Sequence, residues 1–273
     1  MKIQTRKYRP IRIGIFSAPM PHKHIDKAQS YLHRDYIAWI EMSGAIPVII
    51  PYNTPDLTKY LNSINGVVWV GGDIENKKMH TPAQYKTLLS AYEHTFKHAT
   101  NETLRGNYYP IWGTCLGFDF LAMMGNHKGL PHMQKIHKTT PGKLTFRNYS
   151  RIQRVFPATM LRQMAIETVT QQNHAFGFDP DSAQTNQMRR YLRIISIDTS
   201  DISPQRFVNM FEYKHFPFYG TQWHPERPVS ELSKEVAMRL SLFLKRECSK
   251  NQVKTIWNPP GVAISSPFTV LLT

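Results

Sequence analysis

The chain has 273 residues, with 34 lysines and arginines against 19 acidic residues, only two cysteines and a formal net charge of +15. Its hydrophobic fraction of 41% is typical of a globular protein and excludes general disorder. No apolar run approaches the roughly 18 residues of a transmembrane helix, and two cysteines are too few for a disulfide scaffold or a cysteine-rich zinc site. The positive charge indicates an anionic partner, such as nucleic acid, an acidic surface or a polyanionic small molecule.

A basic arm, residues 1–10, precedes the first apolar run. Five basic residues fall at the start of the chain (Lys2, Arg6, Lys7, Arg9 and Arg12). The apolar run that follows is short and has no small-residue cleavage site, which is unlike a secretory signal peptide. We therefore expect an intracellular protein, in the cytoplasm or an organelle, with a solvated arm before its first strand.

Residues 11–125 alternate between strand-like and helix-like segments. Apolar runs predict buried strands at 11–16, 46–50, 66–70 and 108–112. Apolar residues at helical spacing predict helices at 29–42, 57–64, 82–98 and 118–124. Strands separated by helices of these lengths indicate an α/β domain with a largely parallel sheet, whose ligand site lies at the carboxyl ends of the strands.

Beyond Gly125 this alternation breaks down. Loops or hairpins are predicted at 129–154, later and partly antiparallel strands at 193–200, 207–213 and 218–222, and an amphipathic helix at 229–246. The segment after Ser249 is too apolar for a solvated terminus, so we expect it to pack on its own domain or on a partner. The predicted division is an arm (1–10), one core domain (11–248) and a tail (249–273).

The most informative motif is Gly-Thr-Cys-Leu-Gly at residues 113–117, between a predicted strand and a predicted helix. This is the nucleophile-elbow arrangement with Cys115 in place of serine. The glycines allow a sharp turn, and the helix N-terminus favours the thiolate. The backbone N–H of Leu116 then points to where an oxyanion would form. A buried structural cysteine is the alternative for this motif taken alone.

A second motif, Trp-His-Pro-Glu at residues 223–226, follows a predicted strand. A thiolate nucleophile needs an imidazole to hold its proton, and the imidazole needs an acceptor to orient it. The two motifs together predict a catalytic triad of Cys115, His224 and Glu226.

On these motifs the chain resembles the γ-glutamyl hydrolases, peptidase family C26, of the class I glutamine amidotransferase-like superfamily. The resemblance covers roughly residues 11–247. It implies a three-layer, flavodoxin-like α/β sandwich with helices on both faces of a mostly parallel sheet. It also implies that Gly72 is the second oxyanion donor beside Leu116, that Asp119 holds the α-ammonium of a glutamyl substrate, and that His174 binds substrate. Asp119 stands where the family usually has Glu, and Val70 where relatives usually have Pro.

The resemblance implies a cysteine hydrolase that cleaves γ-glutamyl amide bonds, as in folate poly-γ-glutamate, through an acyl-enzyme and without a cofactor or metal. One alternative is a structural subunit of a larger assembly, which would dock through the basic surface or the tail, or form a homodimer. Another is the glutaminase subunit of an amidotransferase, although ammonia-donating relatives usually carry Gln in place of Asp119. Nucleic acid is the less favoured partner.

Part of the positive charge falls in one segment. No acidic residue lies between Asp119 and Glu167, whereas eight basic residues do (Lys128, Lys135, Lys138, Lys143, Arg147, Arg151, Arg154 and Arg162). In the family this region borders the active-site cleft, so we hypothesise that it attracts an anionic substrate such as a poly-γ-glutamyl tail. A solvated basic surface is the alternative. Cys248, at the end of the last predicted helix, is expected to be an inert thiol.

Overall fold

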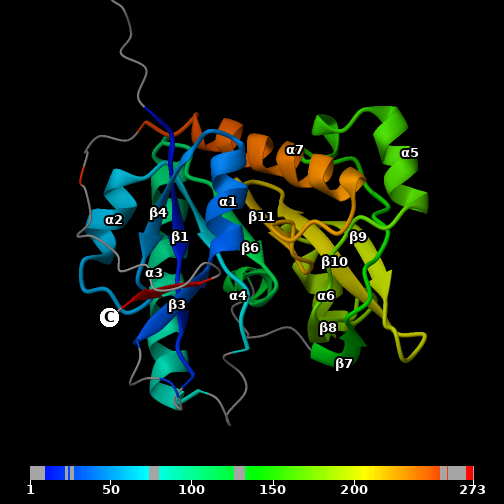
Figure 1. Ribbon diagram of the computed structural model, residues 1–273, viewed down its shortest axis with the longest axis horizontal. Helices are drawn as coiled ribbons and strands as arrows, with labels where there is room; N and C mark the ends of the chain where they lie inside the picture. Colours follow the sequence, from blue (N-terminus) through cyan, green and yellow to red (C-terminus); the bar gives the residue numbers. More distant parts are fainter. Residues whose placement is uncertain are drawn as a thin grey trace, which may run out of the picture.

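The structure is a computed structural model that describes residues 10–21, 24, 28–73, 80–125, 133–252, 257 and 269–272. At its centre lies a seven-stranded sheet with the strand order β4-β1-β5-β6-β11-β10-β9 (Figure 1). The strands span Arg12–Phe16 (β1), Ile46–Ile50 (β4), Gly66–Trp69 (β5), Ile111–Thr114 (β6), Leu192–Thr199 (β9), Arg206–Tyr213 (β10) and Phe218–Thr221 (β11). The first five strands in this order, β4, β1, β5, β6 and β11, run parallel to one another. Strand β10 pairs antiparallel with both β11 and β9.

Helices cover both faces of this sheet. One face carries α2 (Leu57–Ser63), α3 (Pro82–Leu104), α4 (Leu116–Met124) and α6 (Ala183–Met188), and the other carries α1 (Arg34–Met42), α5 (Ala158–Ile166) and α7 (Glu231–Cys248). Successive strand residues point to opposite faces, so that Val68 and Trp69 enter different hydrophobic clusters. Strands buried on both faces read as continuous apolar runs. The predicted α/β sandwich with three layers is confirmed.

The helix pair α1 and α7 packs over the sheet, with the two helices held by bonds between them. The Trp39 indole donates to the Ala237 carbonyl, and the Ser241 hydroxyl donates to the carbonyl of Trp39. Ser230 caps the N-terminus of α7 by accepting from the Ser233 N–H. No helix in the described part of the chain is both long and apolar enough to cross a membrane.

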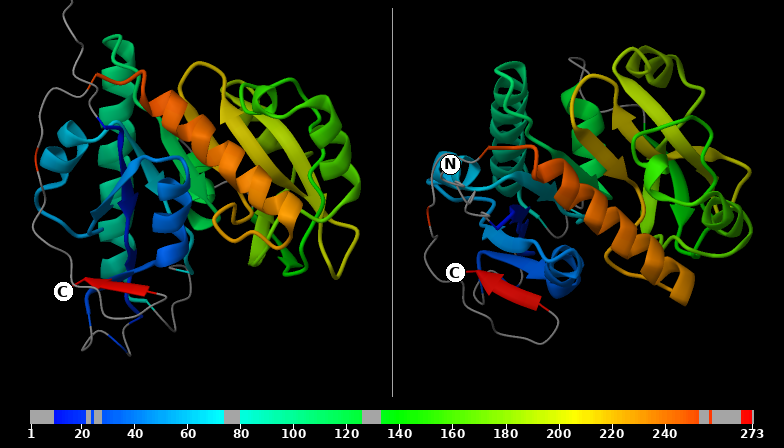
Figure 2. Two further views of the ribbon diagram at one scale, coloured as in Figure 1. Left: turned by 45° about the horizontal axis from the view of Figure 1, so that its top comes forward. Right: turned by 90° about the horizontal axis from the view of Figure 1, so that it is seen from above.

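A second, three-stranded antiparallel sheet has the order β12-β3-β2 and uses Thr269–Leu272, Ser30–His33 and Ala18–Pro19 (Figure 2). The helix predicted at 29–42 is therefore wrong over its first residues, which form β3. Pairing with strands on both sides satisfies the backbone of β3, and this tertiary contact overrides the helical spacing.

The described parts of the tail pack on the rest of the chain. Val270 in β12 is fully buried, and the Trp257 ring lies edge-on to Tyr60 at 4.7 Å. Packing on its own domain was one of the two expectations for the tail. Assembly through it, as a homodimer or with another protein, stays a prediction. The predicted arm lies outside the described residues except for Pro10.

A two-stranded antiparallel sheet joins β7 (Met133–Lys138) to β8 (His174–Phe178), and a 3-10 turn, η2, spans Gln153–Val155. The sequence patterns did not predict β8, α5 or α6. The other predicted strands and helices are present, with ends that differ by a few residues. The largest differences are α3, which continues to Leu104, and β6, which begins at Ile111.

Candidate active site

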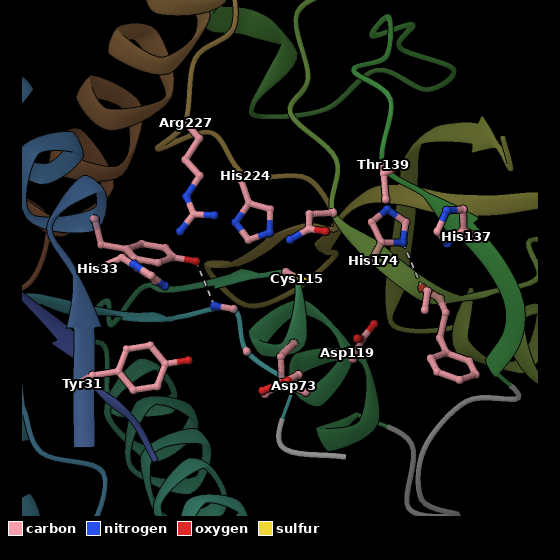
Figure 3. A pocket seen from close by; sticks show the side chains of 17 residues that line it. Tyr31, His33, Asp73, Cys115, Asp119, His137, Thr139, His174, His224 and Arg227 are labelled. Carbon is pink, nitrogen blue, oxygen red and sulfur yellow. Dashed lines mark hydrogen bonds between the residues drawn. The ribbon is translucent and has the colours of Figure 1, made fainter. Parts of the chain in front are cut away.

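A cleft of about 780 Å³ opens at the carboxyl ends of β5, β6 and β11 (Figure 3). This is the edge at which the sequence places a ligand site. Residues from the loops after strands of the main sheet, from helices α1 and α4 and from both small sheets line the cleft (Tyr31, His33, Tyr36, Gly71, Gly72, Asp73, Cys115, Leu116, Asp119, His137, Thr139, Asn173, His174, Ala175, Phe176, His224 and Arg227). It therefore contains every residue predicted from the sequence for the site except Glu226.

Cys115 lies on a sharp turn between β6 and α4. Its φ of 52° and ψ of −111° are strained for a residue with a side chain. A Cβ at Gly113 would come within 2.5 Å of the Gly117 carbonyl oxygen, and one at Gly117 within 2.3 Å of the Trp69 carbonyl oxygen. Strand and helix can approach this closely only because both positions are glycine. The turn presents the thiol at the N-terminus of α4.

The imidazole of His224 lies between the Cys115 thiol and the Glu226 carboxylate. Its Nδ1–H donates to Glu226 Oε1 at 2.7 Å, and the other side of the ring hydrogen-bonds to Cys115. The backbone N–H of His224 donates to the Gln171 carbonyl and fixes the loop that follows β11. The structure thus brings together the three residues predicted as a triad, from two loops more than 100 residues apart in the sequence.

Electrostatic contacts hold His224 in its charged form. Burial alone would lower its pKa, but the Glu226 charge and the hydrogen bonds to Cys115 and Glu226 raise the pKa to about 10. The imidazolium therefore persists through neutral pH. A proton held on this ring beside the sulfur is available to an amine leaving group.

The backbone N–H groups of Gly72 and Leu116, the two donors predicted for an oxyanion, donate to no protein oxygen in the described part of the chain. Neighbouring donors are occupied, because Gly117 donates to the Val70 carbonyl at 3.1 Å and Gly71 donates to the Tyr36 hydroxyl at 2.8 Å. Within the described residues, both predicted donors are therefore available to an oxyanion at Cys115.

Tyr36 is part of the site, although the sequence patterns indicated only a core residue of a helix. Its buried hydroxyl accepts from the Gly71 N–H and lies beside the Glu226 carboxylate. Burial, with the Glu226 charge next, raises the pKa of this phenol well above its ordinary value. Tyr36 thus connects the loop after β5 to the acid behind His224.

Gly71 lies against the Cys–His pair, so Gly71→Ala is expected to lower kcat by about 100-fold through displacement of His224. A Cβ there would lie 2.9 Å from His224 Cε1 and 3.2 Å from Cys115 Cβ. Gly72→Ala is the matched comparison, because its Cβ would meet only Leu116 Cδ2, at 3.4 Å. Kinetics of both variants on one substrate check this. Equal losses in the two variants would contradict the steric argument.

Asp119 and His174 lie toward the other end of the cleft (Figure 3). Asp119 is one helical turn after Cys115 and only 9% exposed. His174 Nε2 faces Gln172 Oε1 at 2.9 Å, and Nδ1 faces the Phe176 carbonyl at 3.0 Å. Burial is the main cause that lowers the pKa of His174 to about 4, so its ring is neutral at pH 7. Because both ring nitrogens already contact protein oxygens, His174 is suited to shaping the cleft rather than to proton transfer.

Sequence reasoning missed several residues of the cleft wall. Tyr31 and His33 come from β3, and His137 comes from an irregular position of β7 with a φ of 45°. Arg227 follows the predicted triad residues directly, so its position three residues after His224 could have identified it. None of the lysines and arginines described in the acid-free segment lines the cleft. Among the described residues, the arginine in the cleft wall is Arg227.

The second cysteine, Cys248, is buried and does not line the cleft. Cys248 is buried against Gly66, and burial raises the pKa of its thiol well above the ordinary value. Within the described ranges, no group of three or more His, Cys, Asp or Glu side chains could hold a metal ion.

Comparison with known proteins gives relatives that are named γ-glutamyl hydrolases. Gamma-glutamyl hydrolase B of Dictyostelium discoideum is 31% identical over 243 residues, which cover 85% of this chain and 67% of that protein. Gamma-glutamyl hydrolase of Homo sapiens is 25% identical over 206 residues, 74% of this chain and 62% of that protein. The chain thus spans about two thirds of the length of these relatives.

Solved structures show the same fold at low identity. The glutaminase domain of Trypanosoma brucei CTPS with bound acivicin matches with a TM-score of 0.55 and 13% identity, over 91% of this chain and 96% of that one. PurLQS of Thermotoga maritima matches with a TM-score of 0.55 and 15% identity, over 86% and 99%. The sequence profile of the Peptidase C26 family matches residues 12–226. Because this match covers most of the chain and ends at the glutamate bonded to His224, the chain belongs to the peptidase C26 family.

Proposed function

We propose that this chain is a cysteine hydrolase that cleaves γ-glutamyl amide bonds. The observation that carries the proposal is the placement of Cys115 on a strained elbow against the His224–Glu226 pair. Membership of the C26 family and the names of the relatives supply the substrate class.

The first half of the reaction forms an acyl-enzyme. The thiolate of Cys115 attacks the γ-carbonyl carbon of the substrate, and the N–H groups of Gly72 and Leu116 donate to the oxygen that becomes negative. The C–N bond then breaks, and the proton of His224 goes to the departing amine nitrogen. Glu226 accepts from Nδ1–H throughout and keeps the other ring nitrogen turned to the sulfur.

The second half releases the glutamyl product. Neutral His224 takes a proton from water, the resulting hydroxide attacks the thioester carbon, and Cys115 leaves as the thiolate. We assign Asp119 to the α-ammonium of the glutamyl unit and His174 to the wall that holds this unit. Both halves use the side chains named, the backbone N–H groups of Gly72 and Leu116, and water.

The experiment compares two substrates with the purified protein. We expect hydrolysis of the dipeptide γ-glutamyl-glutamate and little release of ammonia from free glutamine. Alkylation with iodoacetamide should stop the reaction, with the label on Cys115 by mass spectrometry. A preference for glutamine would favour a glutaminase subunit instead, and the absence of any turnover would favour a structural subunit.

We also propose the division of the chain into an arm (1–10), one core domain (11–248) and a tail (249–273). Attraction of an anionic substrate by the basic segment, the intracellular location and any nucleic-acid or assembly partner stay predictions.

A further inference from the structure

Arg227 is a cationic side chain in the cleft wall that has no role in the proposed mechanism. It follows His224 in a tight turn, with its backbone N–H donating to the His224 carbonyl at 3.1 Å. This bond fixes the arginine backbone relative to the imidazole. The guanidinium extends along the same side of the cleft as the His224 ring (Figure 3).

Among the residues that the structure describes, the guanidinium is bonded through one nitrogen, Nε. Its Nε donates to Asp35 Oδ2 at 3.0 Å, with side-chain exposures of 31% for Arg227 and 50% for Asp35. The two terminal nitrogens bond to no protein group in the described part of the chain. They carry four N–H donors that match the two oxygens of a carboxylate. The Asp35 contact thus anchors the fork without using the donors at its end.

The guanidinium charge acts on this end of the cleft. Burial lowers the pKa of His33, and the Arg227 charge is the next cause. Burial and the Asp73 charge raise the pKa of Tyr31, and the Arg227 charge opposes this rise. The Tyr31 ring stands edge-on to His33 at 5.5 Å. The Arg227 end of the cleft, formed by Tyr31, His33 and Arg227, therefore combines two aromatic rings with one positive charge, and the Asp73 carboxylate also acts on Tyr31.

The chemistry of the triad decides which part of a substrate reaches this end. The departing nitrogen receives its proton from His224, so the leaving unit must lie beside that imidazole. Asp119 and His174 lie on the other side of Cys115, where the glutamyl unit that becomes the acyl group would be held (Figure 3). In an amino-acid leaving unit, the α-carboxylate is two bonds from the departing nitrogen, so it falls near the turn that joins His224 to Arg227.

We propose that Arg227 binds the α-carboxylate of the leaving unit, so that the enzyme selects amino-acid leaving groups over neutral amines. This inference rests on the proposed function and names the specificity of its site. Tyr31 and His33 form the wall against which the leaving unit lies.

The test uses two substrates that differ only at that carboxylate, γ-glutamyl-glutamate and γ-glutamyl-isoglutamine, in which it is a carboxamide. Both keep the same acyl unit. We expect wild-type kcat/KM to favour the first by about 10-fold or more. Arg227→Met should lower kcat/KM on γ-glutamyl-glutamate by about 10- to 100-fold, mainly through KM, and change the value on γ-glutamyl-isoglutamine by less than about threefold. Arg227→Lys should keep part of the preference, because it retains the charge but loses the fork.

Arg239→Met is the matched control. Arg239 pairs with Glu235 on α7 with similar exposures, 33% and 53%, and does not line the cleft. This variant should cleave both substrates as the wild type does. Equal loss on both substrates in Arg227→Met, or no loss on either, would overturn the assignment. If wild-type protein cleaves neither substrate, the proposed function itself is wrong and the assignment falls with it.

Discussion

Cys115→Ala is expected to abolish hydrolysis of γ-glutamyl substrates, with a fall in kcat/KM of at least about 10⁴-fold. The reason is that the acyl-enzyme cannot form without the sulfur, whereas the oxyanion donors and His224 alone give little acceleration. Cys115 is the N-cap of α4 at a φ of 52°, which costs less for alanine than for bulkier residues. The fold should therefore survive the change. Steady-state turnover of γ-glutamyl-glutamate measures the effect.

The matched control for this change is Cys248→Ala. Cys248 is the other cysteine of the chain, fully buried at the end of α7 and remote from the cleft. We expect this variant to keep wild-type turnover with a somewhat lower melting temperature, because a small buried group is lost. Wild-type turnover in Cys115→Ala would contradict the assignment of Cys115 as the nucleophile. So would a loss of turnover in Cys248→Ala that Cys115→Ala does not show.

Glu226→Gln has the second largest expected effect, a fall in kcat of about 10³–10⁴-fold. The glutamine keeps the size of the side chain but removes the charge that raises the pKa of His224 to about 10. Without that charge the pKa of His224 should fall, because burial acts to lower it and only the contacts to Cys115 remain to raise it. A neutral amide also no longer selects the ring form whose Nδ1–H points away from Cys115.

The pH profile separates this mechanism from a loss of folding. In the wild type, kcat/KM should fall as the pH rises through about 10, where His224 loses its proton. In Glu226→Gln, that alkaline limb should move to lower pH. The contribution of the His224–Glu226 pair to the free energy of unfolding also falls with rising pH. It is full below the unfolded pKa of about 6.5 and is lost as the pH rises through about 10. An unchanged alkaline limb in the variant would show that Glu226 does not set the charge of His224.

The parallel part of the sheet could be predicted because its signals are local. Strands such as β4 and β5 are continuous apolar runs, and the helices between them keep their spacing. The start of α1 could not be predicted, because Ser30–His33 has helical spacing but pairs with strands from both sides. β8 was missed for a related reason. Its first residues are partly exposed on the cleft, so its apolar pattern is weak.

In the site too, residues in local motifs could be predicted and residues placed only by the fold could not. Cys115, His224 and Glu226 lie in two short motifs whose chemistry is readable within five residues each. Tyr36 and His137 have no such motif, since one reads as a core residue of a helix and the other as part of a basic stretch. They belong to the cleft only because the fold carries their elements to the strand ends. The basic stretch itself supplied His137 and Thr139 to the cleft, but none of its described lysines or arginines.

The pairing of β12 with β3 sets the order in which the cleft can be completed during synthesis. The Cys115 turn needs residues up to Thr221, whose carbonyl accepts from the Cys115 N–H, whereas Tyr31 and His33 lie on a strand of which one partner begins only at Thr269. Closing a contact over more than 230 residues is slow compared with pairing neighbouring elements. A growing chain can therefore complete the thiol turn before the wall beside Arg227 is held in place by β12. Selection of the leaving unit is then the last property of the cleft to be acquired as the chain folds.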